Sequence, residues 1–278
     1  MCDAHYQPVV KSPVVHFFVL IYPLIGLLSG FLAGLLGIGG GLVIVPALLL
    51  IFPYQGVAAA VVTHTAIATS LATVVVTSLI ATYSHHRHGA VDWPIFRKMA
   101  PGLLGGALIG AMVTSHLPGE TLRVLFGLFA LMAALQMGLQ LQPASQGHVP
   151  ATPWIMVVGA IIGMLSALVG VGGGTMTVPF LRWSNVVMQR AVATSSACGF
   201  PLAAGACLGF TLADEVAGGA AVVNNAIYWP AALWIAAASL VAVPLGARFT
   251  HRISILSLSR IFAFTLAVIG LRLIFVRS

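Results

Sequence analysis

Charged residues are scarce in this 278-residue chain, and their scarcity excludes most soluble functions. Only 6% of the residues are Asp, Glu, Lys or Arg, whereas 60% are hydrophobic and the mean hydropathy is +1.07. A soluble domain typically has roughly a quarter of its residues charged. The composition therefore predicts an all-α polytopic membrane protein whose solvent is the lipid bilayer.

Acidic residues are scarcer still, and the excess of basic residues leaves a net charge of +7. In a soluble protein this excess would point to nucleic acid as a partner. Here the basic residues lie in short loops between apolar runs, where they set the orientation of membrane spans. No nucleic acid partner is expected.

Motifs for metal binding, nucleotide binding and catalysis are also lacking. The three cysteines form no C-x-x-C pattern, so neither a disulfide nor a metal nor another cofactor is predicted. No G-x-x-x-x-G-K-[ST] phrase occurs, which argues against an ATPase within this chain. An enzyme is not expected, and the remaining catalytic alternative is a membrane-embedded hydrolase that uses Ser70 and His64.

One unusual phrase is present twice, as GFLAGLLGIGGGLVIVP at 30–46 and GMLSALVGVGGGTMTVP at 163–179. Backbone that leaves a helix within lipid must be sheltered by protein or line a polar cavity. Paired interrupted segments in corresponding halves of a transporter indicate its binding site. The candidate site glycines are Gly39, Gly40, Gly41, Gly172, Gly173 and Gly174.

Hydropathy predicts about eight membrane spans in two repeats of four. Short apolar pieces after the glycines, Leu42–Phe52 and Thr175–Trp183, reach only about half of a ~30 Å hydrocarbon core, so they are predicted to be half-helices. The first repeat, 14–141, has spans at 14–36, 57–83, 99–116 and 122–141, and a connection at 142–153 leads to the second repeat, 154–276, with spans at 154–169, 191–212, 227–249 and 261–276.

Basic residues predict the orientation of these spans. Arg87, Arg97 and Lys98 mark the loop after the second span as cytoplasmic, and Arg248 and Arg252 mark the loop before the last one. If each half-helix is re-entrant, all these assignments hold at once and the two repeats are inverted. A half-helix that crosses instead would flip the second repeat. The expected location is the cell inner (plasma) membrane, as a multi-pass protein.

The two GxGGG-x4-P phrases are each followed by an Ala-Thr-Ser tripeptide, at 68–70 and 193–195, and the first is also followed by an H-x-R-x-G-x-V-D-W loop within 84–93. With these motifs the chain resembles the sulfite exporter TauE/SafE family of membrane permeases, from about Phe18 onward. The resemblance implies a transporter of a small anion, and family members are associated with sulfite and organosulfonates. Sulfate or a carboxylate stays open as cargo, as do the direction of transport, a proton or Na⁺ as coupling ion, and a homodimer.

The glycine breaks have a chemistry suited to an anion. The first N–H groups of a helix have no intrahelical partner, and glycine lets a ligand approach them. Two such helix ends would form an anion cage without a buried Lys or Arg, which supports alternating access or, as the nearer rival, an anion channel. The alternative interpretation is close helix packing, which we expect for Gly102, Gly105, Gly106 and Gly110.

Hydroxyl groups recur in the two repeats at corresponding positions. Thr69 and Ser70 in the first repeat match Thr194 and Ser195 in the second, and all four are candidate substrate contacts. The alternative is that each hydroxyl bonds a carbonyl of its own helix, as most hydroxyls in membrane helices do.

Two other side chains in the predicted spans are candidates for the pathway. His64 lies well inside a span and is either a proton-coupling group or a packing histidine. Cys198 lies one turn from Thr194 and Ser195, where it lines the pathway or packs as a small residue.

Outside the spans, the polar residues predict structure more than chemistry. Asn224 and Asn225 are expected to cap the seventh span. His85, His86 and His88 lie beside Arg87 without a cysteine or an acidic cluster, which favours a solvated loop over a metal site.

Overall fold

The computed structural model describes residues 13–37, 39–139, 151–216, 226–249 and 255–275, without the side chains of 13–19, 214–216 and 255–261. The described backbone is helical, with no β-strand, and this confirms the predicted all-α fold. Asn224 and Asn225 lie outside the described residues, as does most of the predicted connection at 142–153.

The described elements follow the order of the predicted spans and half-helices. They are α1 (Pro13–Leu36), α2 (Gly41–Ile51), the 3₁₀ helix η1 (Phe52–Gln55), α3 (Val62–His86), α4 (Trp93–His116), α5 (Gly119–Leu139), α6 (Thr152–Val169), α7 (Gly174–Trp183), α8 (Met188–Val216), α9 (Trp229–Phe249) and α10 (Ile255–Phe275).

Five of these helices, α3, α5, α6, α8 and α9, are long and apolar enough in their described residues to cross a membrane. The predicted total of about eight spans in inverted repeats stays a prediction. The start of α4 differs from the expected Met99, because Asp92 caps the helix by accepting a hydrogen bond from the Ile95 N–H at 3.2 Å. Hydropathy did not predict the first turns of α4, because they contain the charged residues Arg97 and Lys98.

The half-helices begin where the glycines predict. Gly40, which precedes α2, has a φ of 75°, and Gly173, which precedes α7, has a φ of 44°. This left-handed region is accessible to glycine at little cost and strains other residues. Neither helix start has a capping hydrogen bond from a side chain.

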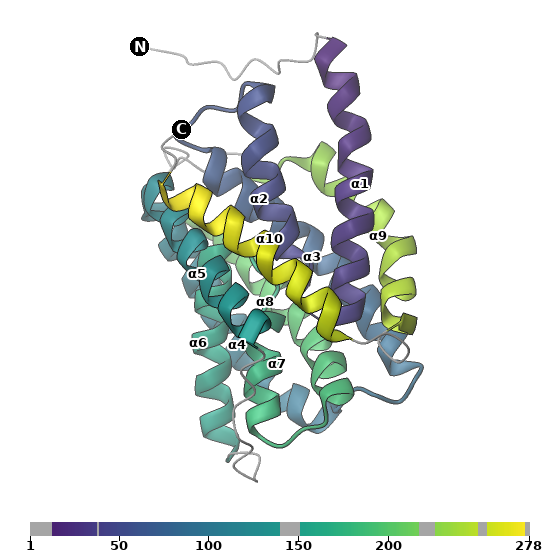
Figure 1. Cartoon of the computed structure of the whole chain (residues 1–278). Coiled ribbons are helices and arrows are strands. Elements are labelled where there is room, and N and C mark those ends of the chain that lie inside the picture. The colour runs from purple at the N-terminus through teal and green to yellow at the C-terminus, as the bar shows by residue number, and fades with distance from the viewer. Residues whose placement is uncertain (1–12, 38, 140–150, 217–225, 250–254, 276–278) are drawn as a thin grey trace.

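The first half-helix folds back along the helix before it. The Tyr22 hydroxyl, in the first half of α1, donates a hydrogen bond to Gln55 Oε1 at 2.7 Å, so the chain after α2 lies beside the first half of α1. In Figure 1, α1 starts at the top of the molecule and α6 starts at the bottom.

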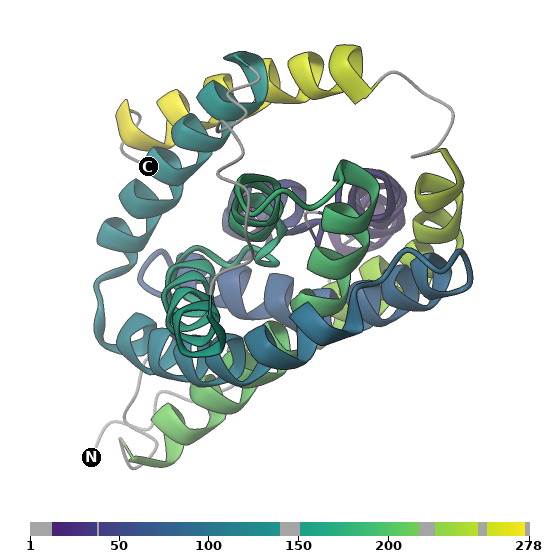
Figure 2. The same cartoon turned by 90° about the horizontal axis from the view of Figure 1, so that it is seen from below.

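Helices of the two halves exchange partners in a corresponding way. The first helix of each half packs on the helix before last of the other, α1 on α9 and α6 on α4, while α3 packs on α8. The last helices, α5 and α10, pair at the periphery (Figure 2).

Small residues bring these helix pairs into backbone contact. A Cβ added to Gly30 of α1 would lie 2.9 Å from Ser239 Cα of α9. On α4, Gly102, Gly106 and Gly110 press against α6 in the same way, whereas Gly105 has nothing within 4 Å. The packing interpretation therefore holds for those three glycines and is wrong for Gly105.

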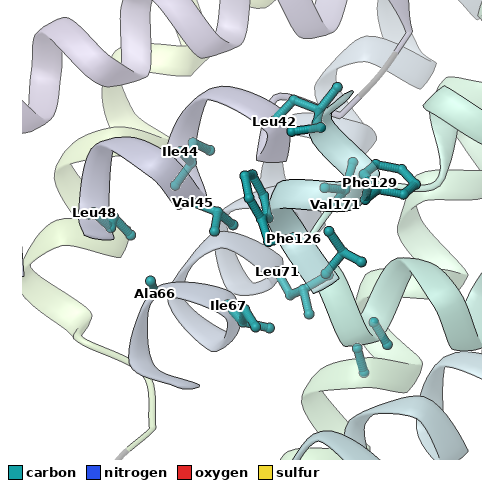
Figure 3. Packing of buried hydrophobic residues seen from close by; sticks show 14 of the residues in the cluster. Leu42, Ile44, Val45, Leu48, Ala66, Ile67, Leu71, Phe126, Phe129 and Val171 are labelled. Atoms are coloured by element: carbon teal, nitrogen blue, oxygen red, sulfur yellow. The ribbon is translucent and has the colours of Figure 1, made fainter. Parts of the chain in front are cut away.

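An apolar core encloses the first half-helix. Buried residues of α2 pack over α3, with aromatic rings of α5 and a residue of the second glycine break beside them (Figure 3). The packing fixes the break in place. The labelled residues are Leu42, Ile44, Val45, Leu48, Ala66, Ile67, Leu71, Phe126, Phe129 and Val171.

Candidate functional site

The two glycine breaks meet back to back. A Cβ on Gly39 would lie 2.8 Å from Gly172 Cα, and a Cβ on Gly172 would lie 2.9 Å from Gly39 Cα. Any side chain at either position would force the breaks apart. Since α2 and α7 each begin two residues later, two helix N-termini start beside this contact.

The serine of each Ala-Thr-Ser tripeptide forms a hydrogen bond with the glycine break of the other half. The Ser70 hydroxyl of α3 donates to the Gly170 carbonyl at 2.8 Å, and the Ser195 hydroxyl of α8 donates to the Gly37 carbonyl at 3.1 Å. Gly37 and Gly170 are the first glycines of the two GxGGG-x4-P motifs. Each half therefore supplies the hydrogen bond that holds the other half's break.

The neighbouring threonines follow the same exchange. Thr69 Oγ1 accepts a hydrogen bond from the Tyr228 N–H at 2.9 Å, and Thr194 Oγ1 accepts one from the Asp92 N–H at 3.0 Å. Tyr228 and Asp92 directly precede α9 and α4, which both begin with Trp-Pro. In this conformation the tripeptides tie the halves together, and their contact with a substrate stays a prediction.

A narrow cavity lies beside the Gly39–Gly172 contact, between α1, α3, α8 and the breaks. Its walls are too close together to seat a water-sized sphere. None of the described lining residues is charged. The lining consists of four glycines and four hydroxyl residues, Gly37, Gly39, Gly172, Gly199, Thr77, Ser78, Ser195 and Ser196, together with Ala33 and Ala81.

The hydroxyls of this lining bond to helix carbonyls. Thr77 donates to Val74 O at 3.3 Å, and Ser196 donates to Val192 O at 3.0 Å. A hydroxyl held in this way can rotate about χ1 toward a ligand. The cavity is thus neutral and polar, with donors that can change partner.

Three of the predicted site residues, Gly39, Gly172 and Ser195, line the cavity. The others are not among its described lining residues: a Cβ on Gly41 would meet Gly170 O, and one on Gly173 would lie 2.8 Å from Leu202 Cδ1. Gly40 and Gly174 flank these positions in the breaks, next to the starts of α2 and α7.

Four polar or small lining residues are not among the predicted site residues: Thr77, Ser78, Ser196 and Gly199. A signal was available, because Thr77 lies seven residues after Ser70 and Gly199 lies four after Ser195. Both spacings return to the same helix face.

His64 is not among the described residues that line this cavity. It is buried, and its Nε2 lies 3.0 Å from the carbonyl of Leu117, the C-cap residue of α4. The Ser70 hydroxyl bonds Gly170 instead, so the pair expected for a hydrolase is not assembled here. Proton coupling through His64 stays a prediction.

Cys198 is 1% exposed and belongs to the apolar core, and it is not among the described residues that line the cavity. This placement favours packing over a role in the pathway.

The expected solvated loop is wrong for His85. The helix α3 continues to His86 and turns His85 inward, where its Nε2 donates to the Gly34 carbonyl at 3.2 Å. His86 and His88 are exposed as expected. Within the described part of the chain, no three His, Cys, Asp or Glu side chains gather in a way that could hold a metal ion.

Fold and site together define a class: a helical membrane protein in which two broken helices meet beside a neutral, hydroxyl-lined cavity. The model of the family "Sulfite exporter TauE/SafE" matches residues 22–273, and the chain belongs to that family.

Relatives in distant organisms agree with this assignment. The chain is 34% identical over 260 residues to a probable membrane transporter protein of Haemophilus influenzae, covering 92% of this chain and 98% of the relative. It is 25% identical over 276 residues to the probable membrane transporter protein YunE of Bacillus subtilis, covering 92% and 97%. No solved structure matches the chain.

Proposed function

We propose that this protein is a secondary transporter of sulfite or a small organosulfonate, which it binds at the paired glycine breaks and moves by alternating access. A membrane transporter follows from the family and its relatives. The observation that carries the finer proposal is the backbone contact of Gly39 and Gly172 beside the cavity.

The chemistry of this place suits an oxyanion. The N-termini of α2 and α7 begin at the breaks without a side-chain cap, so each places the positive end of a helix dipole there. In this conformation the Gly174 and Met176 N–H groups of α7 bond the carbonyls of Gly172 and Gly173. The lining hydroxyls add donors, and no Lys or Arg among the described lining residues would hold an anion too tightly to release it.

Charge and packing support alternation between two sides. The start of α4, the end of α7 and the start of α8 share a small apolar cluster that includes Ile95, Leu181 and Val192. The basic residues Arg97 and Arg182 lie in the same helix ends, which the positive-inside rule assigns to the cytoplasm. Inverted repeats that exchange partners provide two equivalent packings, one open to each side.

The narrow cavity favours a carrier over an anion channel, because a channel needs a continuous path. The coupling ion and a homodimer are further expectations, with His64 as the candidate proton carrier.

Countertransport in proteoliposomes tests the proposal. Unlabelled sulfite inside the vesicles should accelerate entry of labelled sulfite into a saturable carrier, whereas a channel would show flux proportional to the gradient. Sulfoacetate, taurine, sulfate and thiosulfate as competitors would rank the cargo. Gly105→Ala provides a matched control, since Gly105 faces open space. Absence of saturable flux for every anion would refute the proposal.

A further inference from the structure

The repeat assigns every cavity residue a counterpart in the other half. The phrases align Gly37 with Gly170 and Gly39 with Gly172, and the tripeptides align Ser70 with Ser195. Exchanging the halves therefore defines a second, counterpart cavity whose walls share Gly39 and Gly172 with the first. Its wall residues are Ser166, Gly170, Gly172, Gly39, Ser70, Leu71, Val74, Leu202, Ala203 and Ala206.

This counterpart is filled by apolar side chains. Val74 stands where the first cavity has Gly199, and a Cβ on Gly172 would lie 2.9 Å from its Cγ1 atom. Leu202 stands where the first cavity has Thr77, and a Cβ on Gly173 would lie 2.8 Å from its Cδ1 atom. Both Val74 and Leu202 are fully buried, so apolar side chains occupy these two positions of the counterpart.

One hydroxyl in the wall of the second cavity has no hydrogen-bond partner. It belongs to Ser166, which is fully buried and stands where the first cavity has Ala33. It lies one turn before Gly170, the glycine whose carbonyl receives Ser70. Buried hydroxyls nearly always have a hydrogen-bond partner. In the first cavity, Thr77 and Ser78 donate to carbonyls of their own helix. An unpaired hydroxyl here is explained if it has a partner in another conformation.

We propose that the substrate pathway continues past the Gly39–Gly172 contact into this second cavity, that Val74 and Leu202 close it here, and that Ser166 contacts the oxyanion when it opens. The inference rests on the proposed function and assigns the residues of its second conformation. It makes Ser166 a substrate contact that the repeated motifs do not indicate, since its counterpart is alanine.

Side-specific labelling of cysteines tests the pathway. In a variant without Cys2, Cys198 and Cys207, Ser166→Cys and its control Ser196→Cys are treated with a membrane-impermeant thiosulfonate from either side of a vesicle. The two should react from opposite sides, because Ser196 lines the first cavity and Ser166 belongs to the wall of the second. Val74→Gly should accelerate the reaction of Ser166→Cys about tenfold. Labelling of both from the same side, or no reaction of Ser166→Cys in either background, overturns the inference.

Transport by Ser166→Ala provides a second test that does not need cysteine variants. Loss of a hydrogen bond to a charged group should slow sulfite transport about tenfold or more. The melting temperature should stay unchanged or rise, because the hydroxyl has no partner in the folded protein. Wild-type transport by Ser166→Ala would overturn the inference and leave the proposed function intact. Absence of sulfite transport in the unmutated protein would overturn the proposed function, and labelling would still decide the pathway.

Discussion

The two glycine breaks meet at corresponding residues but differ in backbone and in surroundings. Gly39 has a φ of 74°, whereas its counterpart Gly172 is not among the described glycines with a positive φ. Around the first break, Leu42 and Ile44 belong to the apolar core and Ala33 lines the cavity. Around the second, the corresponding positions carry buried hydroxyls without hydrogen-bond partners. The glycines thus bring the breaks together, while the side chains make the halves unequal. The corresponding positions are Ala33, Leu42 and Ile44 in the first half, and Ser166, Thr175 and Thr177 in the second.

Replacing a glycine at the shared contact should have the largest effect. Gly39→Val adds a side chain against Gly172 and strains a residue with a φ of 74°, so we expect a loss of more than about 4 kcal/mol and little folded protein. Size-exclusion chromatography after detergent extraction measures the folded yield. Gly172→Val lacks this strain but would press its side chain against Gly39 and Val74, so it should also give a low folded yield. A normal melting temperature for either variant would contradict the back-to-back contact.

Making the two sides alike should stop transport with less damage to the fold. Gly199→Val places valine in the first cavity at the position that Val74 occupies in the second. The added Cβ would lie 3.0 Å from Ser78 Cβ. We expect a stability loss of about 1–3 kcal/mol from tighter packing and at least a tenfold lower rate of sulfite flux. Vesicle uptake and a thermal melt separate the two effects. Unchanged flux would show that the cavity is not on the pathway.

Two isosteric changes of threonine should have effects of opposite sign. Thr177→Val removes a hydroxyl without a partner and should raise stability by up to about 1 kcal/mol. Thr194→Val deprives the Asp92 N–H of its acceptor and should lower stability by about 1 kcal/mol. Thermal melts of the two purified variants provide the comparison. Equal shifts would mean that the hydrogen bond across the halves contributes nothing.

The smallest effect is expected at Gly105. Its counterpart in α9 is the exposed Val241, and Gly105 itself has nothing within 4 Å. Gly105→Val should therefore change stability by less than about 0.5 kcal/mol and leave sulfite flux unchanged. A large loss in a melt would reveal a neighbour on that face, such as a second copy of the chain.

Local signals made the broken helices predictable. Glycine and proline punctuate the chain, so α2 and α7 begin one residue before the predicted half-helices. The burial of His85 was not predictable from hydropathy, which treats histidine as polar wherever it lies. Its environment depends on where α1 ends relative to α3.

The roles of Thr69 and Ser70 could not be predicted for a similar reason. Their partners lie 159 and 100 residues away in the sequence, and local spacing carries no information about contacts across the halves. The lining residues Thr77 and Ser78 were not predicted, because only the packing of the helices decides which face of α3 lies toward α8. The repeat did reveal which residues correspond, and it is this correspondence that makes the inequality of the halves visible.

The exchange of hydrogen bonds between the halves also bears on how the chain is made. Gly37 leaves the ribosome long before Ser195, which follows it by 158 residues. During synthesis the first half is therefore in the bilayer before the hydrogen bond from Ser195 to Gly37 can form. A chain that stops after α5 would never receive its missing donors, so membrane proteases should degrade it as an unfinished product. Co-expression of the two halves as separate chains should rescue it, because each provides what the other lacks.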